Sequence, residues 1–117
     1  MRYRKNQHLR TAADFSRIRA SGSRRECGFF YMYLLLRPEQ TPPLRRLGVV
    51  ASRRVGNAVA RNRAKRRLRE LFRLEQDNLP ASCDLLLIAR KRIALAGSGD
   101  LRRRFHGALR ALSTGAR

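Results

Sequence analysis

One stretch of this chain, residues 53–73, combines a dense positive charge with an uninterrupted helix-forming composition. It carries eight arginines and one lysine against a single acid, Glu70. From Ala58 to the end of the stretch there is no proline or glycine, and most residues have a high helix propensity. The sequence therefore predicts a long basic helix that begins just after Gly56 and Asn57.

The predicted helix separates its side chains into two arcs when it is wound at about 100° per residue. One arc is apolar and predicts a core-facing stripe, which consists of Ala64, Leu68, Leu71 and Phe72. The neighbouring arc contains no acid and consists of Asn62, Lys65, Arg66, Arg69 and Arg73. Glu70 lies on the far flank with Arg63 and Arg67, and we expect it to pair with Arg66 or Arg67. Solvated helix faces usually mix both signs of charge, so the acid-free arc favours a nucleic-acid-binding face.

The run VGNAVARNRAKRRLRE, residues 55–70, resembles the signature of the bacterial ribonuclease P protein subunit. That family carries Gly-Asn-Ala-Val, then Arg-Asn-Arg, then Lys-Arg and Arg-Glu at this spacing, which makes the match far more specific than a lone short motif. The resemblance extends to Phe15, which precedes a short helix and a glycine. The family often has a second aromatic one turn later, where this chain has Arg19.

The length and the charge of the chain limit its class. With 117 residues it is expected to form a single RNA-binding domain, residues 1–117, with a basic N-terminal tail over residues 1–10. The formal net charge of +20 indicates a polyanionic partner, namely RNA, DNA or an anionic membrane. No apolar run approaches the roughly 18 residues of a membrane span, and no signal peptide is recognisable, so we expect a cytoplasmic protein without a membrane partner. Cys27 and Cys83 are expected to be reduced, buried thiols.

The remaining elements are predicted from caps, turns and periodicity. A helix capped by Thr11 runs to about Ala20, and a last helix begins near residues 98–100. Strands are predicted over 23–26, 29–36, 47–52 and 83–89, with an antiparallel return between the second and the third. The fold class is therefore α+β, with a single four-stranded mixed sheet packed with three helices in the order α-β-β-β-α-β-α. The general rule favours a right-handed strand–helix–strand crossover, whereas the family resemblance implies a left-handed one.

The strand over 29–36 is apolar on both of its faces. Alternation places a core-like set on one face, namely Phe30, Met32, Leu34 and Leu36. The other face carries Phe29, Tyr31, Tyr33 and Leu35. The two tyrosines can form a stacking platform for single-stranded nucleic acid, or they can be half-buried under the first helix. The residues leave both readings open, and the resemblance favours the platform.

The sequence offers no constellation of catalytic residues. Its eight acids are scattered, and its two histidines lie in the N-terminal tail and in the last helix. The residues alone therefore predict an RNA-binding module with no catalytic and no metal-ligating residues. A small ribosomal or rRNA-binding protein and a DNA-compacting protein share this composition, and only the motif spacing favours the ribonuclease P reading.

The resemblance implies a specific division of labour. A catalytic RNA subunit cleaves precursor tRNA, and Mg²⁺ is held mainly by that RNA and by the substrate. The protein binds the RNA subunit and the single-stranded 5′ leader of precursor tRNA, and it has no obligate protein partner. The implied RNA-binding residues are Arg53, Arg54, Asn57, Arg61, Asn62, Arg63, Lys65, Arg66, Arg69 and Arg73. The implied leader-binding cleft consists of Phe15, Arg19, Tyr31 and Tyr33.

Overall fold

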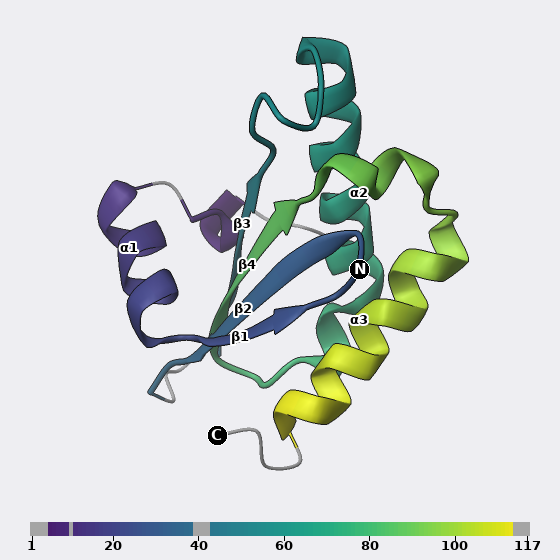
Figure 1. Ribbon diagram of the computed structural model, residues 1–117. Helices are drawn as coiled ribbons and strands as arrows, with labels where there is room; N and C mark the ends of the chain where they lie inside the picture. Colours follow the sequence, from purple (N-terminus) through teal and green to yellow (C-terminus); the bar gives the residue numbers. More distant parts are fainter. Residues whose placement is uncertain (1–4, 10, 39–42, 114–117) are drawn as a thin grey trace.

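A computed structural model describes residues 5–9, 11–38 and 43–113 of the chain. In these residues three α-helices pack on one four-stranded mixed sheet, which confirms the predicted α+β class (Figure 1). The elements are η1 Lys5–Gln7, α1 Ala12–Ser21, β1 Ser23–Glu26, β2 Phe30–Leu36, β3 Arg45–Val50, α2 Ala58–Glu75, η2 Gln76–Asn78, β4 Cys83–Ala89, η3 Lys91–Leu95 and α3 Ser98–Ser113.

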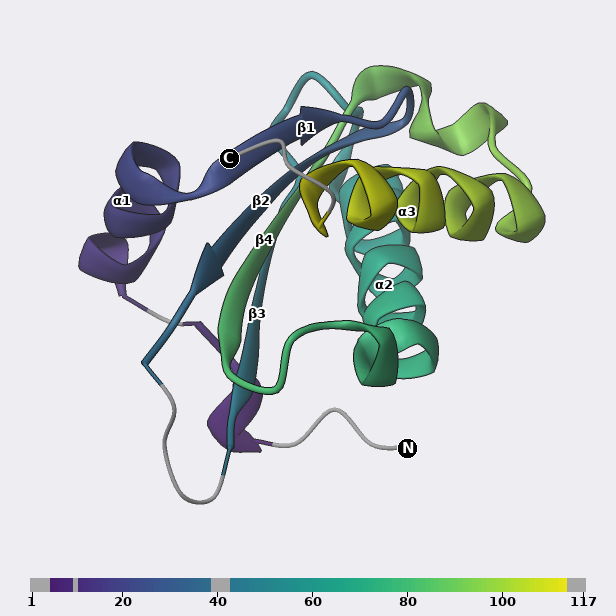
Figure 2. The same ribbon diagram turned by 90° about the horizontal axis from the view of Figure 1, so that it is seen from below.

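The order of the strands in the sheet is β1-β2-β4-β3. β4 pairs antiparallel with β2 and parallel with β3, so β3 does run antiparallel to β2 but is not its neighbour. The continuous apolar run of β4 fits this central place, because a strand covered on both faces needs no polar alternation. Figure 2 looks up along β3 and β4, and the path from β3 through α2 to β4 makes a left-handed crossover.

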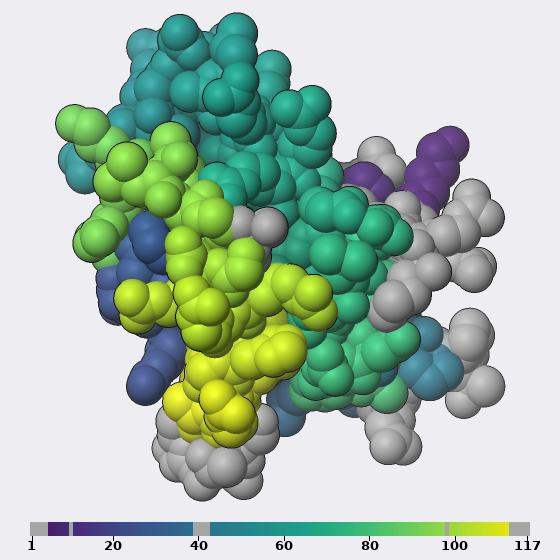
Figure 3. All heavy atoms as spheres, turned by 90° about the vertical axis from the view of Figure 1, so that its right-hand side faces the viewer, coloured from purple at the N-terminus to yellow at the C-terminus, as the bar shows by residue number. Residues whose placement is uncertain are grey.

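The main core lies between the sheet and the pair α2 and α3, which lie side by side on one face of the molecule (Figure 3). The apolar arc of α2 enters this core as predicted, since Ala64, Leu68, Leu71 and Phe72 are all buried. Phe30 and Met32 of β2 meet it from the sheet side. The predicted core set of β2 was wrong at Leu36, which is the last residue of the strand and 66% exposed.

The opposite face of the sheet is covered by α1 (Figure 2). The Thr11 hydroxyl caps α1 by accepting a hydrogen bond from the Asp14 amide at 3.0 Å. Ile18 is fully buried and packs with Leu86 of β4 and with Leu9. α1 is thereby fixed across the sheet by a second, smaller apolar cluster.

The segment before α1 belongs to the fold over residues 5–9. The Leu9 amide donates to the Leu47 carbonyl of β3 at 2.9 Å, and the side chains of Gln7 and Leu9 are buried. Residues 5–9 of the predicted basic tail therefore pack against the sheet, with Leu9 buried beside β3. Residues 1–4 and 10 of the predicted tail lie outside the described residues.

Both cysteines, Cys27 and Cys83, are buried free thiols, as predicted. Burial raises the pKa of each thiol to about 12, so neither is a ready nucleophile at neutral pH. No helix among the described residues combines the length and the apolar composition of a membrane span.

Candidate nucleic-acid interface

The start of α2 is built by the first residues of the Gly-Asn-Ala-Val motif. Gly56 has φ of +146°, and a β-carbon there would lie 2.9 Å from that of Ala60, so a side chain at this position would be both strained and crowded. The Asn57 carboxamide oxygen accepts from the Ala60 amide at 2.9 Å and caps the helix. Arg61 donates to the Gly56 carbonyl at 2.9 Å. Asn57 and Arg61 therefore shape the helix start, a role that the sequence analysis did not assign to them.

Beyond this first turn, α2 presents a row of polar side chains away from the core. Asn62, Arg63, Arg66 and Arg69 are exposed, and Lys65 is half-buried. We refer to these five residues as the α2 stripe. Four of its residues belong to the predicted acid-free arc, whereas Arg63 lies on the flank that also carries Glu70. Its arginines and its lysine can bind phosphate groups.

Besides Arg61, two further arginines of α2 are engaged within the protein. Arg73 donates to both oxygens of Glu70, with Nε to Oε1 at 2.9 Å and Nη2 to Oε2 at 2.5 Å. This hydrogen-bonded pair lowers the pKa of Glu70 and raises that of Arg73. Arg67 donates to the backbone carbonyls of Ile93 and Ala96. The predicted pairing of Glu70 with Arg66 or Arg67 was therefore wrong, because Arg67 is bound to η3 and Arg73 reaches Glu70 one turn later.

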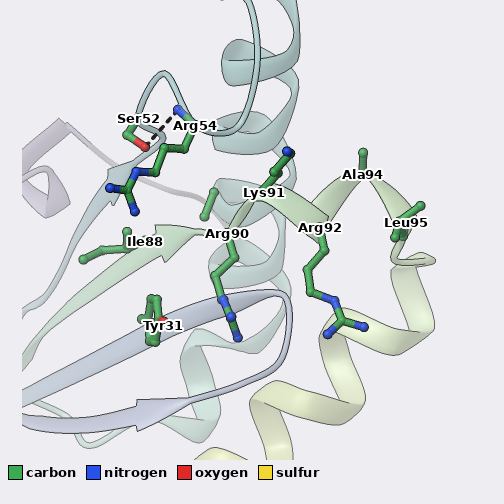
Figure 4. A pocket seen from close by; sticks show the side chains of 10 residues that line it. Tyr31, Ser52, Arg54, Ile88, Arg90, Lys91, Arg92, Ala94 and Leu95 are labelled. Carbon is green, nitrogen blue, oxygen red and sulfur yellow. Dashed lines mark hydrogen bonds between the residues drawn. The ribbon is translucent and has the colours of Figure 1, made fainter.

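A second basic surface surrounds an open hollow of about 900 Å³ where β2 begins and β4 ends (Figure 4). Tyr31 and Ile88 form part of its wall, and Arg54 enters from the turn before α2. Arg90, Lys91 and Arg92 follow β4 and complete the basic rim, with no acid among the described residues that line the hollow. We call this feature the Tyr31 hollow. Its mixture of one aromatic ring and four cations suits an unpaired nucleic-acid strand.

The ring of Tyr31 is flanked by two guanidinium groups. The Cζ atoms of Arg24 and Arg90 lie 4.5 Å and 5.1 Å from the centre of the ring. Arg90 also bonds to the Glu26 carboxylate and donates to the Gly28 carbonyl at 3.3 Å. The sequence analysis did not single out Arg24, although its alternation in β1 puts it on the face of the sheet that carries Tyr31 and Tyr33.

The other predicted cleft residues lie closer to α1. Phe15 and Tyr33 are half-buried and pack against the cluster of Ile18 and Leu86. Arg19 is exposed on α1, and Arg53 is exposed in the turn before α2. The structure thus brings Phe15 and Tyr33 together beneath α1 and places Tyr31 farther along β2. Tyr33 therefore matches the half-buried reading, and the platform reading stays a prediction for Tyr31.

The described residues contain no group of three or more His, Cys, Asp or Glu side chains placed to hold a metal ion. Mg²⁺ prefers near-octahedral oxygen ligands, usually including carboxylates, and the α2 stripe and the Tyr31 hollow offer cations instead. The described part of the chain therefore does not fit a magnesium site.

Comparison with known proteins gives one consistent family. A family model described as Ribonuclease P matches residues 3–113. The ribonuclease P protein component of Desulforapulum autotrophicum is 37% identical over 98 residues, which are 84% of this chain and 81% of the relative. That of Syntrophobacter fumaroxidans is 39% identical over 90 residues, covering 76% of this chain and 73% of the relative.

Solved structures agree with the sequence comparison. The Staphylococcus aureus RNase P protein matches with a TM-score of 0.74 and 26% identity, covering 91% of this chain and 94% of that one. The Thermotoga maritima RNase P protein matches with a TM-score of 0.72 and 27% identity, covering 87% and 94%. These matches extend far beyond the basic motif of residues 55–70.

Proposed function

This chain belongs to the ribonuclease P protein family, and from that membership we propose that it serves as the protein subunit that binds the catalytic RNA and the 5′ leader of precursor tRNA. The holoenzyme removes the leader and leaves the mature 5′ end of the tRNA. The observation that carries this proposal is the presence of two separate basic surfaces, the α2 stripe and the Tyr31 hollow.

The α2 stripe is the proposed contact with the catalytic RNA. Its arginines can form paired hydrogen bonds with phosphate oxygens, and the rigid helix behind them fixes their spacing. Leu68 and Phe72 anchor that helix in the core, so RNA binding need not order a flexible segment. Arg73 is a weaker candidate than its neighbours, because its guanidinium is already paired with Glu70.

The Tyr31 hollow is the proposed contact with the leader. A single strand has bases that can stack on an aromatic ring and phosphates that bind cations. The hollow supplies one aromatic ring and four cations for these contacts. Arg24 and Arg90 already lie over the Tyr31 ring, so a leader base stacks either on the guanidinium layer or on the ring after an arginine moves aside. Phe15 and Tyr33 would support this surface from beneath α1.

The RNA subunit and its magnesium ions would carry out the cleavage, and residues of this protein would take no part in the chemical step. What the protein supplies is positive charge between two polyanions that must approach each other. Each phosphate neutralised by a side chain releases counterions, so binding should weaken steeply as salt is raised. The same cations reduce the amount of magnesium that the two RNAs need in order to associate.

The test is a magnesium titration of precursor tRNA cleavage by the RNA subunit alone, by the protein alone and by both together. We expect no cleavage by the protein alone and a lower magnesium midpoint when the protein is added to the RNA. Cleavage at the mature 5′ end by RNA-free protein would overturn the assignment of the chemistry to the RNA. An unchanged midpoint would overturn the electrostatic role and leave positioning of the substrate.

A further inference from the structure

Three arginines converge on a second hollow, at the end of the sheet where β2 finishes and β4 begins. It has a volume of about 500 Å³, and Arg17 of α1, Arg37 after β2 and Arg46 of β3 all line it. At its base lies Asp84, the second residue of β4, whose side chain is almost completely buried. We call this feature the Arg37 pocket.

The three arginines are not equally engaged by Asp84. Arg46 forms a two-pronged pair with it, with Nε to Oδ1 at 2.8 Å and Nη2 to Oδ2 at 2.9 Å. Arg17 and Arg37 each come only within 3.7 Å of a carboxylate oxygen of Asp84, which is too far for a hydrogen bond. Arg46 is therefore the structural partner of the buried carboxylate, and the other two arginines keep donor capacity.

The side chain of Arg37 gives the main indication that a ligand could bind in the Arg37 pocket. Its Nη1 atom is buried and has no hydrogen-bond partner among the described residues. A buried guanidinium donor without an acceptor is costly, and an oxygen-rich ligand in the pocket would remove that cost. Such donors are rare enough in folded proteins that each calls for an explanation.

The charges around the pocket favour a singly charged anion. The guanidinium groups of Arg17, Arg37 and Arg46 face the carboxylates of Asp84 and Asp14, and Asp14 accepts from Arg17 at 2.8 Å. Three positive and two negative charges leave a net charge of +1. A phosphodiester carries one negative charge and two free oxygens, so it matches both the charge and the unused donors.

The Arg37 pocket is separate from the Tyr31 hollow. Along β4, Asp84, Leu86 and Ile88 point to the same face of the sheet. Ile18 of α1 packs on Leu86, the middle residue of the three, so α1 crosses the face between the two hollows. A strand that leaves the Tyr31 hollow over α1 would meet the Arg37 pocket on the far side.

We propose that the Arg37 pocket binds a phosphodiester group of unpaired RNA on the side of α1 opposite the Tyr31 hollow; this proposal rests on the RNA-binding function proposed above. Two RNAs could supply the group, namely a long leader of precursor tRNA that passes over α1 or a single-stranded part of the catalytic RNA. Arg37 and Arg17 hold the phosphate oxygens, and Asp84 and Arg46 form the rigid base.

The experiment compares the unaltered protein with Arg37→Gln in two binding series at several salt concentrations. The first series uses holoenzyme and precursor tRNAs whose leaders are lengthened one nucleotide at a time. The second measures assembly of the protein with the catalytic RNA. Arg103→Gln is the control, because it removes the same charge from an exposed position on α3, on the opposite face of the sheet. Thermal melts identify any loss of folding, and Arg17→Gln tests the same pocket at a half-exposed position.

We expect Arg37→Gln to weaken one of the two series by about tenfold and to lower its salt slope by about 0.7, the loss of one single-strand phosphate contact. A loss confined to leaders beyond a threshold length identifies the leader as the source, and a loss in assembly identifies the catalytic RNA. If Arg37→Gln and Arg17→Gln match Arg103→Gln in both series, the pocket is not an RNA site although the proposed function stands. If the unaltered protein binds neither RNA, the proposed function itself fails.

Discussion

The ring of Phe15 lies so close to the backbone of Gly48 that a β-carbon at position 48 would come within 2.5 Å of the ring atom Cε1. Phe15 belongs to α1 and Gly48 to β3, so this contact sets how closely the helix approaches the sheet. One side of the Phe15 ring therefore packs on β3, and only the rest of the ring is available to contact the leader.

Gly48→Ala is expected to destabilise the protein by about 1–3 kcal/mol, because the added methyl group must displace Phe15 or the strand. Urea unfolding measures the change in the free energy of unfolding. Gly107→Ala is the matched control, since a β-carbon at that helical position would meet no atom within 4 Å beyond its chain neighbours and its own helix backbone, and about 1 kcal/mol of stabilisation is expected. Equal effects of the two changes would contradict the Phe15–Gly48 contact.

Leu68→Ala and Arg66→Ala should separate the two faces of α2. Leu68 is fully buried, so its truncation should cost about 2–5 kcal/mol of stability. Arg66 is exposed, and its loss should leave stability within about 0.5 kcal/mol while weakening RNA binding and its dependence on salt. Thermal melts and binding titrations of both variants check the assignment, and the reverse ranking in the melts would show that the faces are exchanged.

The sequence predicted these faces because helical periodicity is a local property. Residues three and four apart share a side of a helix whatever surrounds them, so the burial of Leu68 and the exposure of Arg66 followed directly. The partner of Glu70 could not be predicted in this way. Arg67 is unavailable to Glu70 because it donates to the carbonyls of Ile93 and Ala96, which are distant in the sequence.

The order of the strands and the lining of the cleft also depend on contacts between distant parts of the chain, which local patterns do not show. Alternation marked the two faces of β2, but no local pattern shows that β4 is inserted between β2 and β3. The guanidinium layer on Tyr31 likewise combines Arg24 and Arg90, which are far apart in the sequence. The cationic arc of α2 was therefore predictable, whereas the exact lining of the Tyr31 hollow required the strand order.

Tyr31→Ala should weaken binding of precursor tRNA by about 1–3 kcal/mol, the value of one base stacked on an aromatic platform, and leave mature tRNA binding nearly unchanged. Tyr31 suits this test better than Tyr33, because Tyr33 also packs in the apolar cluster under α1. Binding of both tRNAs to the reconstituted holoenzyme provides the measurement. Equal losses for the two substrates would exclude a role specific to the leader.

The ionisation of Glu75 is expected to make the stability of the protein depend on pH. Its side chain is buried; burial would raise its pKa, but hydrogen bonds with His106, Arg102 and Asn78 outweigh this and lower the pKa below its usual 4.5. A lowered pKa in the folded state means that the stabilisation is complete above about pH 4.5 and is lost as the pH falls through the folded pKa.

The unfolding free energies of the unaltered protein and Glu75→Gln should therefore differ most above about pH 4.5 and converge as the pH falls below it. Urea unfolding at a series of pH values measures the difference. Glu70→Gln is the control: its pair with Arg73 is exposed, so its effect should be small and should be screened by salt. A difference for Glu75→Gln that stays constant with pH would show that the carboxylate is not preferentially ionised in the fold.

Arg67 should act as a structural residue although it lies within the basic motif. Its guanidinium donates to the carbonyls of Ile93 and Ala96 and so ties α2 to η3, the element that carries Lys91 and Arg92 of the Tyr31 hollow. Hydrogen bonds from a charged donor are worth about 1.5–3 kcal/mol, so Arg67→Ala should lose stability on that scale. Arg63→Ala, at an exposed position one turn earlier, should change stability by less than about 0.5 kcal/mol.

The two variants should also differ in RNA binding. Arg63→Ala should reduce the salt slope of RNA binding, whereas Arg67→Ala should reduce precursor binding by displacing η3. Lysine should not restore Arg67, because an ammonium group lacks the planar fork that reaches two separate carbonyls. Arg67→Lys could instead match the unaltered protein in both stability and precursor binding. Positive charge alone would then account for the effect of Arg67, and its hydrogen bonds to the carbonyls after β4 would not contribute.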